Sequence, residues 1–205
     1  MPMSKIIPVE MLLSGYRSGV FPMAQDGRIE WYRPGQRGLI PLDERFHVPH
    51  GLRRALKRRP FELRWNTVFP EVMTACAARA ETWIDAVILQ SYCRLLHELG
   101  LAHSVECWDA EGLQGGLYGV ALGGAFFGES MFSRKTDASK IALVELVRHL
   151  REAGAVLLDT QWMTPHLLQF GGLTLPRRQY EQTLAAALAV SLRLPYPPPE
   201  RHRPS

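Results

Sequence analysis

Three consecutive apolar segments in the middle of the chain constrain its fold more than any other feature. They cover residues 103–108, 113–121 and 125–132. The links between them are Asp-Ala-Glu-Gly and Gly-Gly, which are short and rich in the residues that hairpin turns use. Strands joined by such short links run antiparallel. The sequence therefore predicts a three-stranded antiparallel meander at the centre of the protein.

Helix-forming segments flank this meander on both sides. Gly19, Gly100 and Gly154 each follow a periodic segment, as glycines that end helices do. Asn66 or Thr67 is expected to cap one of the helices. We expect helices at 9–18, 50–59, 67–80, 85–99, 138–153 and 179–192, a short helix after Thr164, and further strands at 29–32, 38–41, 61–65 and 155–159. This order predicts a mixed α+β fold and fits the acetyltransferase-like (GNAT) architecture.

Charge is distributed unevenly along the 205 residues, which carry a net charge of +4. Residues 1–61 contain 11 of the 24 Lys and Arg but only 5 of the 20 Asp and Glu, giving +6, whereas residues 62–205 carry −2. This asymmetry predicts a polyanionic partner for the first segment. We expect a small basic N-terminal α/β domain over 1–61 and a GNAT-like domain over 62–205, with a frayed proline-rich tail at 195–205.

Composition argues against several classes of protein. Cys76, Cys93 and Cys107 are too few for a disulfide framework and lack zinc-ligand spacing, so we expect small core residues in a reducing compartment. His97 and His103 have no third ligand at metal spacing. No apolar segment approaches the ~18 residues of a membrane span, and the first residues do not form the apolar core of a signal peptide. We expect a cytoplasmic protein without a metal site.

One carboxylate lies within an apolar strand. In the segment Phe-Phe-Gly-Glu-Ser-Met-Phe-Ser at 126–133, strict alternation puts Glu129 on the same face as Phe127 and Met131. A carboxylate between large apolar neighbours loses hydration, which is costly unless a cation or a hydrogen-bond donor compensates. Either Glu129 pairs with a basic residue at 134–135, or it lies at the bottom of an apolar pocket suited to an ammonium or guanidinium group.

A second carboxylate follows the short apolar strand at 155–159. Asp159 ends this strand, and open α/β sheets place their sites at such strand ends. Gln161 lies two residues further on, so it shares a face with Asp159 if the strand continues. The two would offer an acceptor and an amide able to orient an attacking amine. The alternative is that Asp159 caps a turn and Gln161 lies on the surface.

A basic cluster marks the helix expected at 50–59. Five of the seven residues at 53–59 are Lys or Arg, and none is acidic. This density favours phosphate binding over an ordinary solvated helix face. The cations that fall on one face, opposite the apolar residues of the helix, are Arg53, Arg54, Lys57 and Arg58.

Short motifs are spread over residues 12–188 in a fixed order. They are Thr-Trp-Ile at 82–84, His-Glu-Leu-Gly at 97–100, Ala-His-Ser-Val-Glu at 102–106, Gly-Gly-Leu-Tyr-Gly-Val at 115–120, Gly-Glu-Ser-Met-Phe-Ser at 128–133, Ala-Ser-Lys at 138–140, Asp-Thr-Gln at 159–161, and Pro-Arg-Arg at 176–178 before Tyr180. In order and spacing these motifs resemble the bacterial leucyl/phenylalanyl-tRNA–protein transferases.

The resemblance implies an aminoacyltransferase that moves Leu, Phe or sometimes Met from aminoacyl-tRNA to a protein beginning with Arg or Lys, creating a substrate for N-end-rule degradation. Aminoacyl-tRNA is then a co-substrate, no cofactor is needed, and the basic helix would contact the tRNA backbone. Gln161 is implied in catalysis, supported by Asp159, with Glu129 near the aminoacyl ester and Trp83 stacking on the terminal adenosine. The implied pocket for the aminoacyl side chain consists of Leu117, Phe126, Met131, Leu146, Leu150 and Leu158.

The chain departs from the family pattern at Met23, where many members have tryptophan after Phe-Pro. Two other functions are compatible with the scaffold. One is a GNAT-type acyltransferase, although the segment 133–140 lacks the glycines that hold the pyrophosphate of acyl-CoA, so another donor would be needed. The other is a non-catalytic module that binds tRNA or a degron. The presence of Glu129, Asp159 and Gln161 together favours the transferase.

Overall fold

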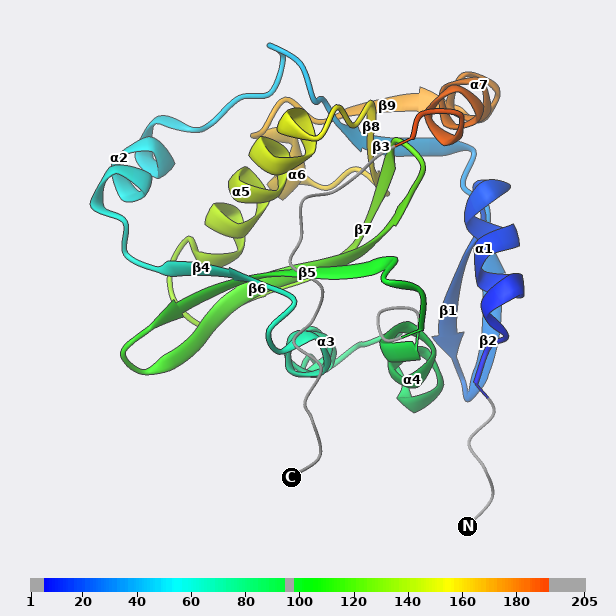
Figure 1. Ribbon diagram of the computed structural model, residues 1–205, viewed down its shortest axis with the longest axis horizontal. Helices are drawn as coiled ribbons and strands as arrows, with labels where there is room; N and C mark the ends of the chain where they lie inside the picture. Colours follow the sequence, from blue (N-terminus) through cyan, green and yellow to red (C-terminus); the bar gives the residue numbers. More distant parts are fainter. Residues whose placement is uncertain (1–5, 95–97, 192–205) are drawn as a thin grey trace.

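A seven-stranded sheet with the order β4-β5-β6-β7-β8-β3-β9 runs through the centre of the computed structural model, which describes residues 6–94 and 98–191 (Figure 1). The predicted meander is confirmed, because β5, β6 and β7 pair antiparallel, while β8 lies parallel to β7. The expected tail at 195–205 and the role considered for His97 lie outside the described residues. The strands of the sheet are β3 (Gln36–Ile40), β4 (Glu62–Trp65), β5 (Ala102–Asp109), β6 (Gly112–Leu122), β7 (Ala125–Ser133), β8 (Leu157–Gln161) and β9 (Leu173–Pro176).

A separate hairpin is formed by β1 (Phe21–Gln25) and β2 (Arg28–Tyr32). Its turn residues Asp26 and Gly27 have φ angles of 49° and 73°, as the Asp-Gly turns of tight hairpins do. Of these two strands, the sequence predicted only the second. The first strand was not predicted because it contains Pro22, and proline is unfavourable inside sheets. Proline is tolerated here because each strand of a two-stranded sheet has a free edge.

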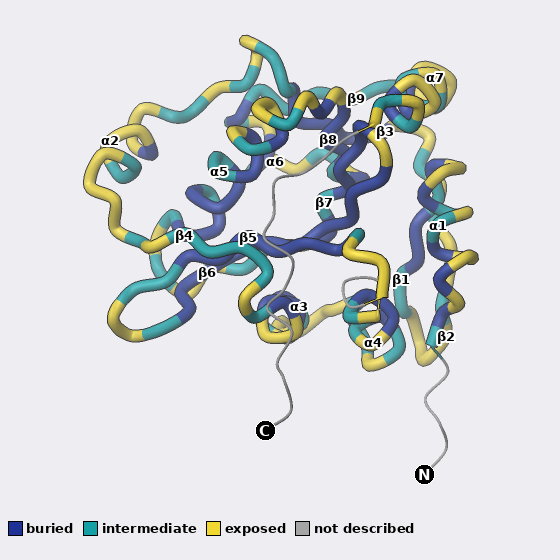
Figure 2. Tube along the Cα trace, in the orientation of Figure 1, coloured by how far each residue is buried: buried dark blue, intermediate teal, exposed yellow. Residues whose placement is uncertain are grey.

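Helices cover both faces of the sheet, and a hydrophobic core lies on each side (Figures 1 and 2). Residues of α2, α5 and α6 belong to one core, and residues of α1, α3, α4 and α7 belong to the other. The predicted mixed α+β fold is therefore confirmed, and Thr164 caps α6 as expected. The helices are α1 (Val9–Arg17), α2 (His50–Arg58), α3 (Phe69–Ala77), α4 (Ala86–Arg94), α5 (Ala138–Glu152), α6 (Pro165–Leu168) and α7 (Arg177–Leu188).

Helix α3 begins without a side-chain cap from the residues expected to supply it. Its N-cap is Val68, which makes no such bond. Instead Glu106 on β5 accepts hydrogen bonds from the backbone N–H groups of Thr67 and Val68, both at 3.0 Å. This carboxylate is completely buried, and its negative charge is favourable at a helix N-terminus. A side chain of the sheet thus fixes the start of the helix.

The first 61 residues contribute to the central sheet. Strand β3 lies between β8 and β9, and Leu52 of α2 belongs to the same core as α5. The boundary expected after residue 61 therefore does not separate two sheets or two cores. Within the described ranges, no helix is both long enough and apolar enough to cross a bilayer.

Candidate active site

A cavity of about 250 Å³ adjoins the end of β8. Its lining combines buried apolar side chains with a few polar groups, as small-molecule sites do. The buried lining residues include Phe21, Leu117, Tyr118, Glu129, Leu143, Leu146, Leu158, Gln161 and Leu167, and the more exposed ones include Met23, Arg79, Trp83, Trp162 and Thr164.

Four of the six residues expected to form an apolar pocket line this cavity, namely Leu117, Met131, Leu146 and Leu158. The other two, Phe126 and Leu150, do not line it, because both are completely buried within the adjoining hydrophobic core. Leu143 and Leu167 also line the cavity and were not predicted from the sequence. Leu143 carried a usable signal, since it precedes Leu146 by three residues and so shares its helix face.

Glu129 lies on a β-bulge in β7. The pairing of β7 with β6 skips this residue, which is the extra residue of the bulge. The bulge interrupts the strict alternation of side chains, so Phe127 packs into one core and Met131 packs against the other. The expectation that Glu129 shares a face with both is therefore wrong. The carboxylate nevertheless lines the cavity and is buried, as the apolar-pocket alternative predicted.

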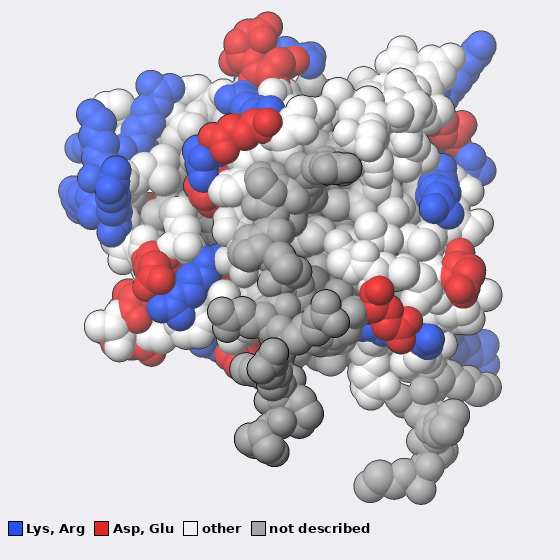
Figure 3. All heavy atoms as spheres, viewed as in Figure 1, with Lys and Arg blue, Asp and Glu red and all other residues white. Residues whose placement is uncertain are grey.

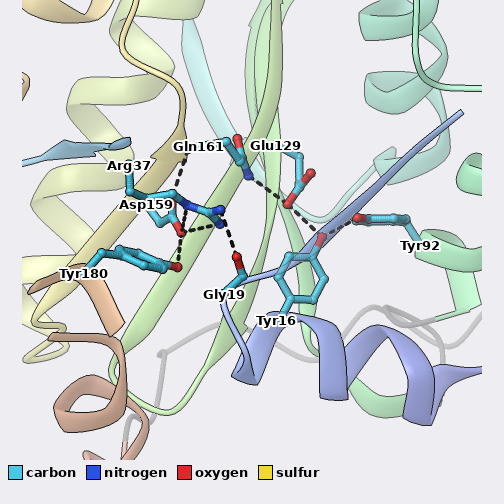
Figure 4. Close-up of polar contacts among 8 residues, drawn as sticks. All are labelled: Tyr16, Gly19, Arg37, Tyr92, Glu129, Asp159, Gln161 and Tyr180. Carbon is cyan, nitrogen blue, oxygen red and sulfur yellow. Dashed lines mark hydrogen bonds and ion pairs between the residues drawn. The ribbon is translucent and has the colours of Figure 1, made fainter. Parts of the chain in front are cut away.

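Neutral donors contact the Glu129 carboxylate. Tyr16 donates its hydroxyl to Oε1 at 2.7 Å, and Gln161 donates Nε2 to the same oxygen at 3.1 Å (Figure 4). The basic residues at 134–135 bind other groups. Burial raises the pKa of Glu129 to about 8; the hydrogen bond from Tyr16 acts in the opposite direction, and the negative charge of Asp159 adds to the increase.

Asp159 is held by a guanidinium group. Arg37 donates Nε to Oδ1 at 2.9 Å and its Nη2 lies 2.8 Å from Oδ2, with both side chains buried. Tyr180 donates its hydroxyl to Oδ2 at 2.6 Å. The guanidinium carbon of Arg37 also lies 4.7 Å from the ring centroids of Phe21 and Tyr180. These contacts fix the Asp159 carboxylate as the counter-charge of Arg37.

Gln161 connects the two carboxylates. Its backbone N–H donates to Asp159 Oδ1 at 2.8 Å, while its side chain donates to Glu129. Asp159 thus caps the turn, but Gln161 is buried and not on the surface. The φ angle of Gln161 is +58°, a left-handed conformation that residues other than glycine rarely adopt and that is found at functional sites. Within the described ranges, no hydrogen bond reaches its Oε1, which is available to a ligand.

Four members of this network were not predicted from the sequence: Tyr16, Arg37, Tyr92 and Tyr180. They come from α1, β3, α4 and α7, and Figure 4 shows them converging with Tyr92 bonded to the Tyr16 hydroxyl. Partners this far apart in sequence leave no local pattern. Tyr180 alone carried a signal, because it follows the Pro-Arg-Arg motif of the resemblance.

Aromatic and cationic side chains line the more exposed part of the cavity. Trp83, expected there from the resemblance, and Met23 both line it. Arg79 donates Nη2 to Ser130 Oγ at 2.7 Å and so ties the segment before α4 to β7. Trp162 is 43% exposed. Arg79 and Trp162 were not predicted: Arg79 belongs to none of the motifs, whereas Trp162 directly follows the Asp-Thr-Gln motif, a signal that could have identified it.

Helix α2 presents a basic face to solvent (Figure 3). Its one buried residue is Leu52, which packs into the core shared with α5. The predicted amphipathic arrangement is confirmed. The exposed cations are Arg53, Arg54, Lys57 and Arg58.

Within the described ranges, no group of three His, Cys, Asp or Glu side chains could hold a metal ion. All three cysteines are free. Burial raises the pKa of Cys76 and Cys107 to about 12, so these thiols stay protonated as core residues. His103 is buried, and burial lowers its pKa to about 4.

The chain matches two family models. Residues 39–185 match leucyl/phenylalanyl-tRNA protein transferase, and residues 7–35 match the N-terminal domain of that family. A leucyl/phenylalanyl-tRNA–protein transferase from Akkermansia muciniphila is 61% identical over 87% of this chain and 95% of the relative. One from Herpetosiphon aurantiacus is 52% identical over 92% and 98%. The structure of L-PGS from Bacillus licheniformis is 16% identical, with a TM-score of 0.44 over 64% of this chain and 47% of that one, too distant a likeness to support a conclusion.

Proposed function

The chain belongs to the leucyl/phenylalanyl-tRNA–protein transferase family, and we propose that it transfers Leu, Phe or Met from aminoacyl-tRNA to the α-amino group of a protein beginning with Arg or Lys. The product would enter N-end-rule degradation. The observation that carries this proposal is the apolar cavity that contains Glu129 and Gln161, with Asp159 bonded to the Gln161 backbone. The reaction needs no cofactor, because the aminoacyl ester is already activated, and it takes place in the cytoplasm, where aminoacyl-tRNA is made.

The aminoacyl side chain occupies the apolar part of the cavity. The walls there offer contact area without directional hydrogen bonds, and they include Leu117, Met131, Leu143, Leu146 and Leu158. A hydrophobic pocket discriminates by only ~1–3 kcal/mol per methylene. Tolerance among Leu, Phe and Met follows from this limit.

Gln161 orients the acceptor amine. Its Oε1 accepts an N–H of the amine, while Nε2 remains bonded to Glu129 and the backbone N–H to Asp159. An amide is too weak a base to remove a proton, so the contribution of Gln161 is alignment of the nitrogen lone pair with the ester carbonyl. Asp159 and its partner Arg37 hold the turn that carries Gln161 in place.

Glu129 accepts a proton from the acceptor. An α-ammonium group has a pKa of ~8, and the pKa of Glu129 is also about 8, so the transfer is close to balanced. The neutral amine then attacks the ester carbonyl carbon. The C–O bond to the ribose breaks, and the proton lost by the new amide nitrogen passes to the ribose oxygen. Glu129 finally releases its proton to solvent.

The basic face of α2 contacts phosphates of the tRNA, so affinity for aminoacyl-tRNA should fall with salt. Replacing Arg53, Arg54, Lys57 and Arg58 with Gln should raise the KM for aminoacyl-tRNA and leave the KM for the peptide unchanged.

We also propose the GNAT-like architecture, which is supported by the order of an antiparallel meander, helix α5 and the parallel strand β8.

The test is transfer of radiolabelled leucine from Leu-tRNA to a peptide beginning with Arg. A peptide beginning with Ala is the matched acceptor control, and acetyl-CoA is the alternative donor. We expect label in the Arg peptide only. Binding of Leu-tRNA without transfer would make the chain a binding module, and transfer from acetyl-CoA alone would make it an ordinary acyltransferase.

A further inference from the structure

Trp162 is a large aromatic side chain that remains 43% exposed in the lining of the cavity. Its ring makes edge-type contacts with Phe21, at a centroid distance of 5.0 Å and an angle of 87°, and with Tyr32, at 6.1 Å and 70°. Among the described residues, these are the aromatic rings that contact the Trp162 indole, and neither lies parallel to it. The ring is held at its position by these contacts, yet within the described ranges no aromatic ring stacks on its face.

The backbone fixes the position from which this ring projects. The N–H of Trp162 donates to the carbonyl of Thr160 at 2.7 Å, closing a three-residue turn around Gln161 and its φ of +58°. Across the turn, a Cβ on Gly38 would lie 2.6 Å from the carbonyl carbon of Trp162 and from the next backbone nitrogen, so β3 approaches this segment closely. The turn that orients Gln161 also directs the Trp162 ring.

The cavity therefore has two different parts. Leucines supply much of its buried wall, whereas the lining also includes Trp83, Met23 and Trp162, which are more exposed, and Phe21, whose ring contacts Trp162. Phe21 and Met23 share a face of β1 because they are two residues apart. The backbone N–H of Ala24, the next residue, donates to the backbone carbonyl of Trp83 at 3.0 Å. Phe21 thus precedes Met23 on β1, and Trp83 is joined to the residue that follows it.

Aminoacyl-tRNA carries its amino acid on the ribose of a terminal adenosine. When the amino acid occupies the aliphatic wall, the adenine lies toward the exposed rings, and stacking on aromatic rings is how proteins hold unpaired bases. We propose that Trp162 is a stacking surface for this adenine, supplying ring area that the Met23 thioether does not. The proposal rests on the proposed function, since it assumes an aminoacyl-tRNA donor.

The first test is kinetic. Trp162→Leu removes the ring but keeps an apolar side chain, and it should raise the KM for Leu-tRNA about tenfold with kcat within twofold of the wild type. Trp162→Phe keeps a ring and should stay within about threefold. The matched control is Trp31→Leu, because Trp31 is 36% exposed on the neighbouring strand β2 but does not line the cavity. That control should leave the KM unchanged.

The second test moves the ring. In the double variant Met23→Trp/Trp162→Leu, a new indole on β1 should recover most of the lost affinity for Leu-tRNA. A purely structural role for Trp162 predicts no such recovery, because an indole at position 23 cannot replace packing against Phe21 and Tyr32.

The third test separates this proposal from the transfer reaction. A non-hydrolysable aminoacyl-adenosine amide should bind the wild type more tightly than Trp162→Leu by about the same factor as the kinetic effect, measured by calorimetry without an acceptor. Failure of transfer by the wild type would overturn the proposed function and leave this binding measurable. Equal binding by both proteins, or a raised KM for the peptide alone, would overturn the role of Trp162 and assign the ring to packing or to the acceptor.

Discussion

Glu129 and Asp159 lie on the neighbouring parallel strands β7 and β8, and both are buried, yet their surroundings differ. Asp159 is bound by the Arg37 guanidinium and the Tyr180 hydroxyl. Among the described residues, the hydrogen-bond donors to Glu129 are the neutral groups of Tyr16 and Gln161. Burial raises the pKa of Glu129 to about 8, and the charge of Asp159 contributes to that increase.

Different partners give two similar carboxylates separate tasks. A carboxylate with a permanent buried counter-charge serves as a fixed anion that holds structure, whereas one with neutral partners can gain and lose a proton near neutral pH. Asp159 therefore supports the turn at Gln161, and the surroundings of Glu129 fit the proton transfer that we propose for it. Substitutions on the Asp159 side should therefore mainly change stability, and substitution of Glu129 should mainly change catalysis.

The largest expected effect is on the Asp159 side. Asp159→Asn leaves the buried Arg37 guanidinium without a counter-charge, which should lower the free energy of unfolding by about 3–5 kcal/mol. Urea denaturation at pH 7 measures this. The matched variant is Asp159→Asn/Arg37→Met, which removes both charges and should be more stable than Asp159→Asn alone. A double variant that is less stable than the single one contradicts the assignment of Asp159 as a counter-charge.

On the Glu129 side the expected effect is on catalysis. Glu129→Gln keeps the size and the hydrogen-bonding capacity of the side chain but cannot accept a proton, so kcat should fall about 100-fold or more. The free energy of unfolding at pH 7 should not decrease. The control is Glu71→Gln on the exposed surface of α3, which should transfer at the wild-type rate. Wild-type rates from Glu129→Gln in the peptide assay would remove Glu129 from the mechanism.

A smaller effect on the free energy of unfolding should distinguish two buried tyrosines, Tyr180 and Tyr118. Tyr180 donates to a charged carboxylate, so Tyr180→Phe should lower the free energy of unfolding by about 1.5–3 kcal/mol. The hydroxyl of Tyr118 is buried and has no hydrogen-bond partner among the described residues, so Tyr118→Phe should be neutral or stabilising. Thermal and urea unfolding of the two variants give the comparison. Equal losses would mean that the bond to Asp159 contributes nothing specific.

The sequence alone was sufficient to single out both carboxylates and Gln161. A polar residue within or directly after an apolar strand is visible locally, and the cost of burying it points to a partner or a task. Nothing local identified Arg37 or Tyr16, because they lie 122 and 113 residues away from the carboxylates they bind. The bulge at Glu129 was equally hidden, since alternation in the sequence assumes an uninterrupted strand.

The same distinction between local and distant contacts applies to the fold. The meander was predictable because its short links force neighbouring strands to pair. The position of β3 between β8 and β9 was not, since those partners follow more than 110 residues later in the chain. The expected boundary after residue 61 relied on a change in charge, but charge reports the surface of a protein, and the core of this protein crosses that position.

The smallest expected effect, counted per pH unit, is on the free energy of unfolding as a function of pH. It tests the difference between Glu129 and Asp159 most directly. The pKa of Glu129 is about 8 in the folded protein and has an ordinary value of 4.5 in the unfolded chain. Between these values the unfolded chain has released the proton while the folded protein keeps it, so folding stability falls as pH rises. The stabilisation is fully present below pH 4.5 and is lost as pH rises through about 8.

Glu129→Gln lacks this titration, whereas Asp159 is unchanged in both proteins. The free energy of unfolding of Glu129→Gln relative to the wild type should therefore grow by on the order of 1 kcal/mol per pH unit between pH 5 and 8 and level off above pH 8. Urea denaturation of the two proteins across this range measures the difference, in which all other titrating groups cancel. A difference independent of pH would show that Glu129 does not keep its proton in the folded protein.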